Sequence, residues 1–275
     1  MTFHASFNCL WCGRPHTTRT PDDLEGWAQL CPDCVGRAQD NEFLRFRLRD
    51  GLRRRGAAAD DDRMLKDYYA ARAGEYDDLY LGDGLTPIEQ AQFQADLDAA
   101  TLWLDDLPFH GEIVELAAGT GWWSPLLAQK GELWLYDVSG EVLDRARDRL
   151  LAHRVRAHIH LRDAWAEPDR QVDCLFCGAW ISHVPRARLA EFLSICRRWL
   201  KPGGLLAFVD EASAWGFAPV VDEHQRRTLK NGREFSIIKV YYEPVELEAA
   251  LLAAGFASAE VSSTSRFFLI GRATV

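Results

Sequence analysis

The stretch GEIVELAAGTGWWSPLLAQKGELWLYD, residues 111–137, decides the fold of this chain. It begins with an apolar run at 113–116, continues through the small residues 117–121 and then takes on helical spacing. A second apolar run at 133–136 ends on Asp137. This order is typical of two neighbouring strands of an open α/β sheet, which are joined by a tight turn and a helix.

The small-residue loop and the acid after the second strand predict a cofactor site. In an open α/β sheet, ligands bind outside the carboxyl ends of the strands. Gly119 and Gly121 let the backbone approach a ligand closely, and Asp137 can accept hydrogen bonds from both hydroxyls of a ribose. These residues predict a nucleoside-containing cofactor. Residues 119–124 come within one residue of the pattern GxGxxG, so the loop by itself leaves a dinucleotide open.

Further segments, in chain order, separate the two cofactor classes. They are Glu115 before the loop, Asp163-Ala164-Trp165 after a third strand, VDCLFCGAW at 172–180 as a fourth strand, and LKPGG at 200–204 leading into a fifth. With this ordered set, residues 61–275 resemble the class I S-adenosylmethionine (SAM)-dependent methyltransferases. The resemblance implies an α/β fold with a doubly wound, seven-stranded, mostly parallel sheet. It also implies SAM as cofactor and methyl transfer to an acceptor.

The resemblance further implies which residues bind SAM. They come from a helix at 63–76 that covers the cofactor, from the first loop and from the ends of strands two to four: Tyr69, Tyr76, Glu115, Ala117, Gly119, Gly121, Asp137, Val138, Asp163, Ala164 and Cys177. Ala117 stands where the family usually has its first glycine, and alanine is still small. In the family, the acid equivalent to Asp163 meets the adenine amino group, and the next backbone amide meets the ring. Alternatively, Asp163 caps a helix, and the two tyrosines belong to an aromatic face of their helix that packs in the hydrophobic core.

The loop after the fourth strand, GAWISHVP at 178–185, leaves the sheet beside the sulfonium in the family fold. Trp180 and His183 are therefore expected to line the acceptor pocket, and the alternating run at 235–242 to cover it. His183 is the candidate catalytic residue, because an imidazole titrates near neutral pH and can act as a general base; a packing role is the alternative. The Pro-Cys and Asn/Asp-Pro-Pro-aromatic motifs of nucleobase methyltransferases are missing here, which favours a small-molecule acceptor.

Seven cysteines, an odd number, favour reduced thiols and metal ligation over a disulfide framework. Four of them form two CxxC pairs with 18 residues between the pairs: Cys9 and Cys12, then Cys31 and Cys34. This spacing predicts a tetrahedral zinc site that is structural, because four thiolates leave no position open for chemistry. A redox CxxC or free thiols are the alternatives. Cys174 and Cys177 have the same spacing, but positions i and i+3 of a strand face opposite ways, so we expect buried thiols.

The positive charges are concentrated near the start of the chain. Residues 1–56 carry nine Lys and Arg against seven Asp and Glu, whereas the remainder carries 23 against 34, a net charge of −11. Arg45, Arg49 and Arg53 recur every four residues on a helix predicted at 37–55. A zinc module beside such a stripe resembles ribosomal RNA methyltransferases, so RNA is the alternative acceptor. The acidic remainder would repel a phosphate backbone, which favours the small molecule.

These patterns predict three segments: a zinc ribbon at 1–36, a basic amphipathic helix and linker at 37–60, and a methyltransferase domain at 61–275. No apolar run approaches the roughly 18 residues of a membrane span. The start of the chain also lacks a basic segment followed by an apolar one. We therefore expect a cytoplasmic enzyme with no membrane partner. A protein that binds SAM without turnover, as a sensor or scaffold, is the alternative from another class.

Overall fold

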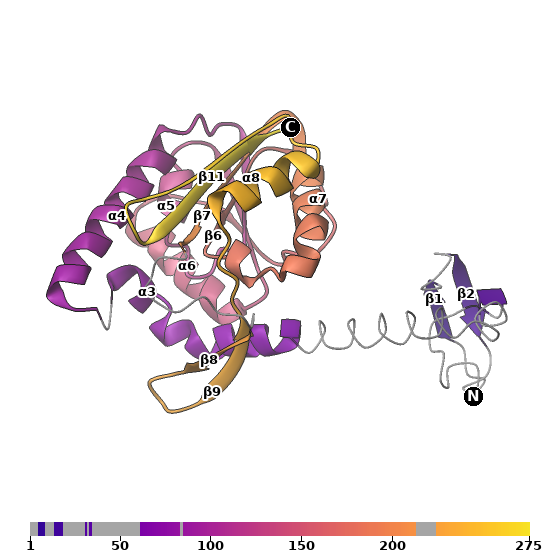
Figure 1. Ribbon diagram of the computed structural model, residues 1–275, viewed down its shortest axis with the longest axis horizontal. Helices are drawn as coiled ribbons and strands as arrows, with labels where there is room; N and C mark the ends of the chain where they lie inside the picture. Colours follow the sequence, from indigo (N-terminus) through magenta and orange to yellow (C-terminus); the bar gives the residue numbers. More distant parts are fainter. Residues whose placement is uncertain are drawn as a thin grey trace. The chain divides into compact units, whose positions relative to one another are not determined.

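The computed structural model describes residues 5–8, 14–18, 31, 33–34, 61–82, 85–212 and 224–275 (Figure 1). The chain divides into two compact units, Met1–Asp60 and Asp61–Val275. Three features predicted from the sequence lie outside the described residues, and they are Cys9, Cys12 and the arginine-striped helix at 37–55.

The first unit contains a short β-hairpin. Strand β1 (Ala5–Asn8) pairs antiparallel with β2 (Pro15–Thr18). In the second CxxC pair, the backbone N–H of Cys34 donates to the carbonyl oxygen of Cys31 over 2.9 Å. This bond closes a turn at the second pair.

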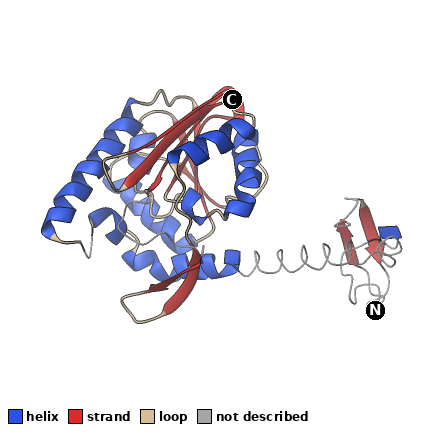
Figure 2. Ribbon diagram, in the orientation of Figure 1, coloured by secondary structure: helices blue, strands red, loops and turns tan. Residues whose placement is uncertain are grey.

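The second unit is built on a seven-stranded sheet with the order β10-β11-β7-β6-β3-β4-β5 (Figure 2). Its strands are β3 (Glu112–Leu116), β4 (Glu132–Asp137), β5 (His158–Leu161), β6 (Val172–Gly178), β7 (Leu200–Glu211), β10 (Ser258–Ser263) and β11 (Phe268–Thr274). Strands β3 to β7 pair in parallel, whereas β11 pairs antiparallel with both β7 and β10. The predicted fold, a seven-stranded and mostly parallel sheet, is confirmed.

Helices cover both faces of the sheet. They are α4 (Pro87–Asp106), α5 (Ser124–Leu127), α6 (Gly140–Ala152), α7 (Leu189–Trp199) and α8 (Pro244–Ala253). One core joins α4, α5 and α6 to the sheet through residues such as Phe93, Leu127 and Leu143. A second core joins α7 and α8 to the opposite face through residues such as Phe192 and Leu247. Burial on both faces explains why β6 is an almost continuous apolar run.

Local sequence sets several element boundaries. At the start of α4, Thr86 and Glu89 form a capping box, with Pro87 in the first turn. The fifth strand differs from the prediction, because β7 begins at Leu200 and not at 205. Leu200 pairs with Val172, and the register then shifts before Cys174. Pairing of this early segment makes the strand longer than its apolar run indicates.

A helix over residues 61–72 and a β-hairpin pack against each other beside the sheet (Figure 1). The hairpin consists of β8 (His224–Thr228) and β9 (Glu234–Ile238). Leu65 and Tyr68 of the helix join Leu229 and Ile237 of the hairpin in a small apolar cluster. The predicted helix at 63–76 thus begins slightly earlier and ends at 72, where a 3-10 turn, η2 (Ala73–Glu75), and then α3 (Asp78–Leu81) follow. Within the described ranges, no helix has the length and apolar character needed to cross a bilayer.

Candidate functional site

A cavity lies at the carboxyl edge of the sheet, beneath the helix at 61–72. It encloses about 610 Å³ of empty space, part of it open to solvent. Seven of the eleven residues predicted to bind the cofactor line it: Tyr69, Tyr76, Ala117, Asp137, Val138, Asp163 and Ala164. The other four predicted residues, Glu115, Gly119, Gly121 and Cys177, do not line it. Side chains from a helix, a loop and three strand ends therefore converge where the sequence pattern places a ligand.

Asp137 is held in place by two backbone amides. Its Oδ2 accepts from the N–H of Gly119 and its Oδ1 from the N–H of Ser139, each over 2.9 Å. Burial raises the pKa of Asp137 above its usual value, and these amide bonds partly oppose the rise. Each carboxylate oxygen has a second lone pair and can accept one more hydrogen bond. This geometry fits a ligand with two neighbouring hydroxyls, as on a ribose.

The loop after β3 has a left-handed backbone at three predicted positions, Ala117, Gly119 and Gly121. Gly119 has a φ of 56°, and a Cβ there would lie 2.5 Å from the hydroxyl oxygen of Tyr76. The glycine is thus required for the close packing of Tyr76. Ala117 has a φ of 51°, a conformation that favours glycine. The alanine that departs from the family pattern therefore carries backbone strain, although its side chain is small.

Glu115 and Cys177 are buried residues of β3 and β6 and do not line the cavity. Glu115 is buried, its Oε2 accepts from the hydroxyl of Ser124 over 2.6 Å, and burial raises its pKa to about 8. This contact ties the end of β3 to the start of α5. Cys177 and Cys174 are buried in the sheet, as predicted, and burial raises the pKa of both thiols.

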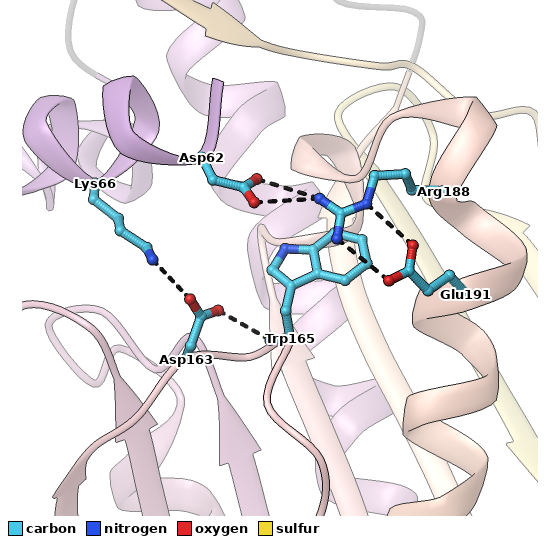
Figure 3. A network of polar contacts seen from close by, with 6 residues as sticks. All are labelled: Asp62, Lys66, Asp163, Trp165, Arg188 and Glu191. Atoms are coloured by element: carbon cyan, nitrogen blue, oxygen red, sulfur yellow. Dashed lines mark hydrogen bonds and ion pairs between the residues drawn. The ribbon is translucent and has the colours of Figure 1, made fainter. Parts of the chain in front are cut away.

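Two ion pairs tie the helix at 61–72 to the sheet edge (Figure 3). Lys66 Nζ lies 2.7 Å from Asp163 Oδ2, while Asp163 Oδ1 accepts from the N–H of Trp165 over 3.0 Å. Arg188 lies 3.2 Å from Asp62, and its guanidinium carbon is 3.6 Å from the centre of the Trp165 ring. Such partly exposed pairs contribute little stability each, so the apolar contacts of Leu65 and Tyr68 with the hairpin contribute more to holding the helix.

A second, smaller cavity of about 340 Å³, open solvent included, adjoins the first. Its lining residues are Tyr69, Arg72, Tyr76, Ala179, His183, Glu211, Arg227, Ile237 and Lys239. Tyr69, Tyr76 and Ala179 line both cavities. His183 lines this cavity, and Arg227 and Ile237 of the β8–β9 hairpin form part of its wall. Trp180 lines the larger cavity instead. Arg72 and Arg227 line the smaller cavity, although neither was predicted as a site residue.

The hydrogen bonds of His183 determine its tautomer. Its Nδ1 lies 2.6 Å from the carbonyl oxygen of Ile238, which can only accept, so Nδ1 carries the proton. Nε2 then has a free lone pair and accepts from the hydroxyl of Tyr69, 2.5 Å away. Burial, followed by the positive charge of Lys239, lowers the pKa of His183 well below 6.5. The imidazole is therefore neutral at pH 7 and has no ring nitrogen left for a direct bond to a ligand.

Known proteins resemble this fold and site. Residues 113–204 match the family model described as a methyltransferase domain. A solved DhpI–SAM–HEP complex is 30% identical, with a TM-score of 0.66, over 78% of this chain and 97% of that chain. A DhpI–SAH complex is 31% identical, with a TM-score of 0.63, over 75% and 93%. The chain belongs to the class I SAM-dependent methyltransferases.

Curated proteins match a shorter part of the chain. The ubiquinone/menaquinone biosynthesis C-methyltransferase UbiE of Pseudomonas fluorescens (strain SBW25) is 30% identical over 118 residues. That match covers 40% of this chain and 45% of the relative, so the chain spans about half the length of the curated relative. The similarity therefore supports the family and does not by itself transfer an acceptor.

Proposed function

We propose that the protein transfers the methyl group of SAM to a small-molecule acceptor held in the smaller cavity. The observation that supports this most directly is the junction of the two cavities at Tyr69, Tyr76 and Ala179. SAM bound in the larger cavity would supply an electrophilic methyl group carried on a sulfonium. The protein's main task is then to hold the two reactants in the correct relative orientation. This positioning can lower the activation free energy of methyl transfer by up to roughly 7–11 kcal/mol.

The residues of the larger cavity fit SAM in kind and position. Asp137 would accept from the ribose hydroxyls, and Asp163 with the amide of Ala164 would meet the adenine. Asp163 is engaged by Lys66 in this structure, so the two would exchange partners or share the carboxylate. The indole Nε1 of Trp180 is buried without a partner among the described residues, and a bound ligand could satisfy it. Glu115, Gly119, Gly121 and Cys177 would act by shaping the loop and the floor.

His183 would act through Tyr69. If the acceptor atom carries a proton, that proton would pass to the hydroxyl oxygen of Tyr69 as Tyr69 gives its own proton to Nε2 of His183. The short Tyr69–His183 contact and the neutral imidazole support this route. An acceptor atom that is already ionised would not need it, and His183 would then serve only to orient Tyr69.

A small acceptor is also supported by the relatives and by the charge of this unit. The UbiE proteins are named as C-methyltransferases of ubiquinone and menaquinone biosynthesis, and these products are small molecules. Residues 57–275 carry a net charge of −11, which opposes the phosphate contacts that an RNA substrate needs. RNA as acceptor would depend on the arginine stripe at 37–55, which lies outside the described residues.

A structural zinc ion in the first unit is part of the proposal. The spacing of the four cysteines and the turn closed by the bond from Cys34 N–H to the Cys31 carbonyl support it. Only two of these four cysteines belong to the described residues, and among those residues no cluster of three or more metal-binding side chains occurs. The four thiolates would supply folding energy to residues 1–36 and no catalysis.

A single-turnover assay tests the function. Full-length protein is mixed with methyl-labelled SAM and with either the small-molecule or the RNA fraction of a cell extract. We expect label in the small-molecule fraction, with strong loss in an Asp137→Asn variant. Label found only in RNA would overturn the acceptor class. SAM binding without label in either fraction would support a non-catalytic SAM-binding protein.

A further inference from the structure

We propose that the acceptor carries an oxyanionic group, a carboxylate or a phosphonate or phosphate, which the smaller cavity binds through Arg72, Arg227 and Lys239. This inference rests on the proposed function, because it names the chemical class of the acceptor. It depends on three features of the cavity: two cations without a counterion, a third cation fixed at its wall, and a histidine that stays neutral.

Arg72 is a half-buried cation that forms no ion pair with a carboxylate of the described residues. Its guanidinium carbon lies 5.6 Å from the centre of the Tyr68 ring and 5.9 Å from that of Tyr76. Throughout the described part of the chain, its side chain forms no ion pair and no hydrogen bond. Ring contacts hold the plane of a guanidinium and leave its N–H edges available. A partly desolvated charge of this kind is stabilised by an anion that enters the cavity.

Arg227 repeats this pattern from the other wall. It belongs to β8, where side chains alternate between the two faces of the hairpin. Arg227 lines the cavity and has no ion pair among the described residues, whereas its neighbour Arg226 is exposed and lies 3.7 Å from Glu234. The two arginines have the same side chain but lie on opposite faces of the hairpin, so Arg226 is a matched control for Arg227.

The remaining charges do not cancel these two cations. Lys239 is buried, and its Nζ lies 2.8 Å from Glu211 and 2.9 Å from the hydroxyl of Ser182. Asp210, beneath the cavity, accepts from the N–H of Ser182, and burial raises its pKa. Three cations thus stand against two carboxylates, one of which is engaged by the lysine. His183 adds no charge, because burial lowers its pKa.

An oxyanion is the ligand that suits this arrangement. Guanidinium groups bind carboxylate and phosphate oxygens with paired N–H donors, and such charge-assisted bonds are stronger than neutral ones. A neutral acceptor would leave Arg72 and Arg227 uncompensated, and a cationic acceptor would be repelled. The charge pattern therefore selects small acids over neutral or cationic compounds of the same size.

Calorimetry on the full-length protein saturated with SAH tests the inference, because SAH has no methyl group to transfer. The probes are acetate and methylphosphonate, with acetamide and dimethyl methylphosphonate as their neutral counterparts, all at one ionic strength. We expect at least one oxyanion to bind at least about tenfold more tightly than its neutral counterpart. The probe that binds shows whether the site prefers a carboxylate or a phosphonate.

Variants locate the binding. Arg227→Gln should weaken oxyanion binding at least about tenfold, as should Arg72→Gln, while Arg226→Gln leaves it unchanged. SAH affinity should stay within about threefold in all three variants, which shows that they fold. Oxyanion binding no tighter than that of the neutral counterparts, or equal effects of Arg227→Gln and Arg226→Gln, would overturn this inference alone. Failure of wild-type protein to bind SAM or SAH would instead overturn the proposed function.

Discussion

The hydroxyl of Tyr69 donates to Nε2 of His183 over 2.5 Å, although the two residues are 114 positions apart in the chain. His183 in turn donates from Nδ1 to the carbonyl of Ile238 on β9. This chain of two bonds links the covering helix, the loop after β6 and the hairpin at the wall shared by the two cavities. Both bonds are made by the neutral imidazole in one tautomer. Protonation at Nε2 would keep the bond to Ile238 and would reverse the direction of the bond to Tyr69.

We expect this link to make stability depend on pH. The pKa of His183 is lowered in the folded state, so the unfolded chain binds a proton first as pH falls below about 6.5. The contribution of neutral His183 to stability is therefore present above that pH and is lost below it. Chemical denaturation between pH 7 and 5 should show wild type losing stability relative to His183→Gln. The prediction would be contradicted if the difference in free energy of unfolding between wild type and His183→Gln stayed constant from pH 7 to 5.

Glu115 should have the opposite pH dependence. Its pKa is raised to about 8, so the folded state keeps a proton that the unfolded chain releases above about 4.5. Wild type should lose stability relative to Glu115→Gln as pH rises from about 4.5 to 8, by a few kcal/mol at about 1.4 kcal/mol per pKa unit. Above pH 8 the difference should level off. Denaturation curves that stay parallel across this range would show that Glu115 is ionised in the folded protein.

Asp137 should dominate SAM affinity. Replacing it by Asn removes an acceptor for the ribose hydroxyls, and bonds to charged groups are worth roughly 1.5–3 kcal/mol. Calorimetry should show SAM binding weakened at least about tenfold. Asp144→Asn is the control, because Asp144 is an exposed acid of α6 that pairs with Arg147 outside the cavity. Unchanged affinity in the Asp137 variant, or tighter binding of NAD than of SAM, would reject the assignment of the larger cavity.

The strained alanine offers a stabilising substitution. Ala117 has a φ of 51°, so Ala117→Gly relieves strain at some cost in the entropy of the unfolded chain. We expect a net gain of up to about 1 kcal/mol, or a rise in Tm of about 2–4 °C. Ala118 is buried and has no left-handed backbone, so Ala118→Gly should lower Tm. A fall in Tm for both variants would show that the alanine at 117 is not strained.

Metal analysis of the purified protein should find one zinc per chain. Replacing Cys31 and Cys34 by Ser should release the metal and unfold residues 1–36, while SAM affinity changes by no more than about threefold. Asp33→Asn, between the two cysteines, should keep the zinc because a carboxylate is not needed by a four-thiolate site. Protein without zinc, or a double variant that retains it, would refute the metal site.

Much of the fold could be predicted from local pattern. Short apolar runs with small-residue turns indicate parallel strands, and the capping box at Thr86 and Glu89 marks the start of α4, because these signals act within a few residues. The early start of β7 could not be predicted, since Leu200 becomes a strand residue only by pairing with Val172. Strand pairing between distant segments leaves little trace in local sequence.

The candidate site also has features that local sequence predicts and features that only the tertiary structure reveals. By itself the sequence determined the class of fold, the loop after β3 and the acid at Asp137, because an apolar run followed by small residues and a carboxylate is a local arrangement. Tertiary structure alone decided that Lys66 meets Asp163, that Tyr69 forms a hydrogen bond with His183, and that Arg72 and Arg227 line one cavity. These contacts join residues roughly a hundred or more positions apart. Their side chains meet because separate elements bury common apolar surface, and no local pattern encodes that meeting.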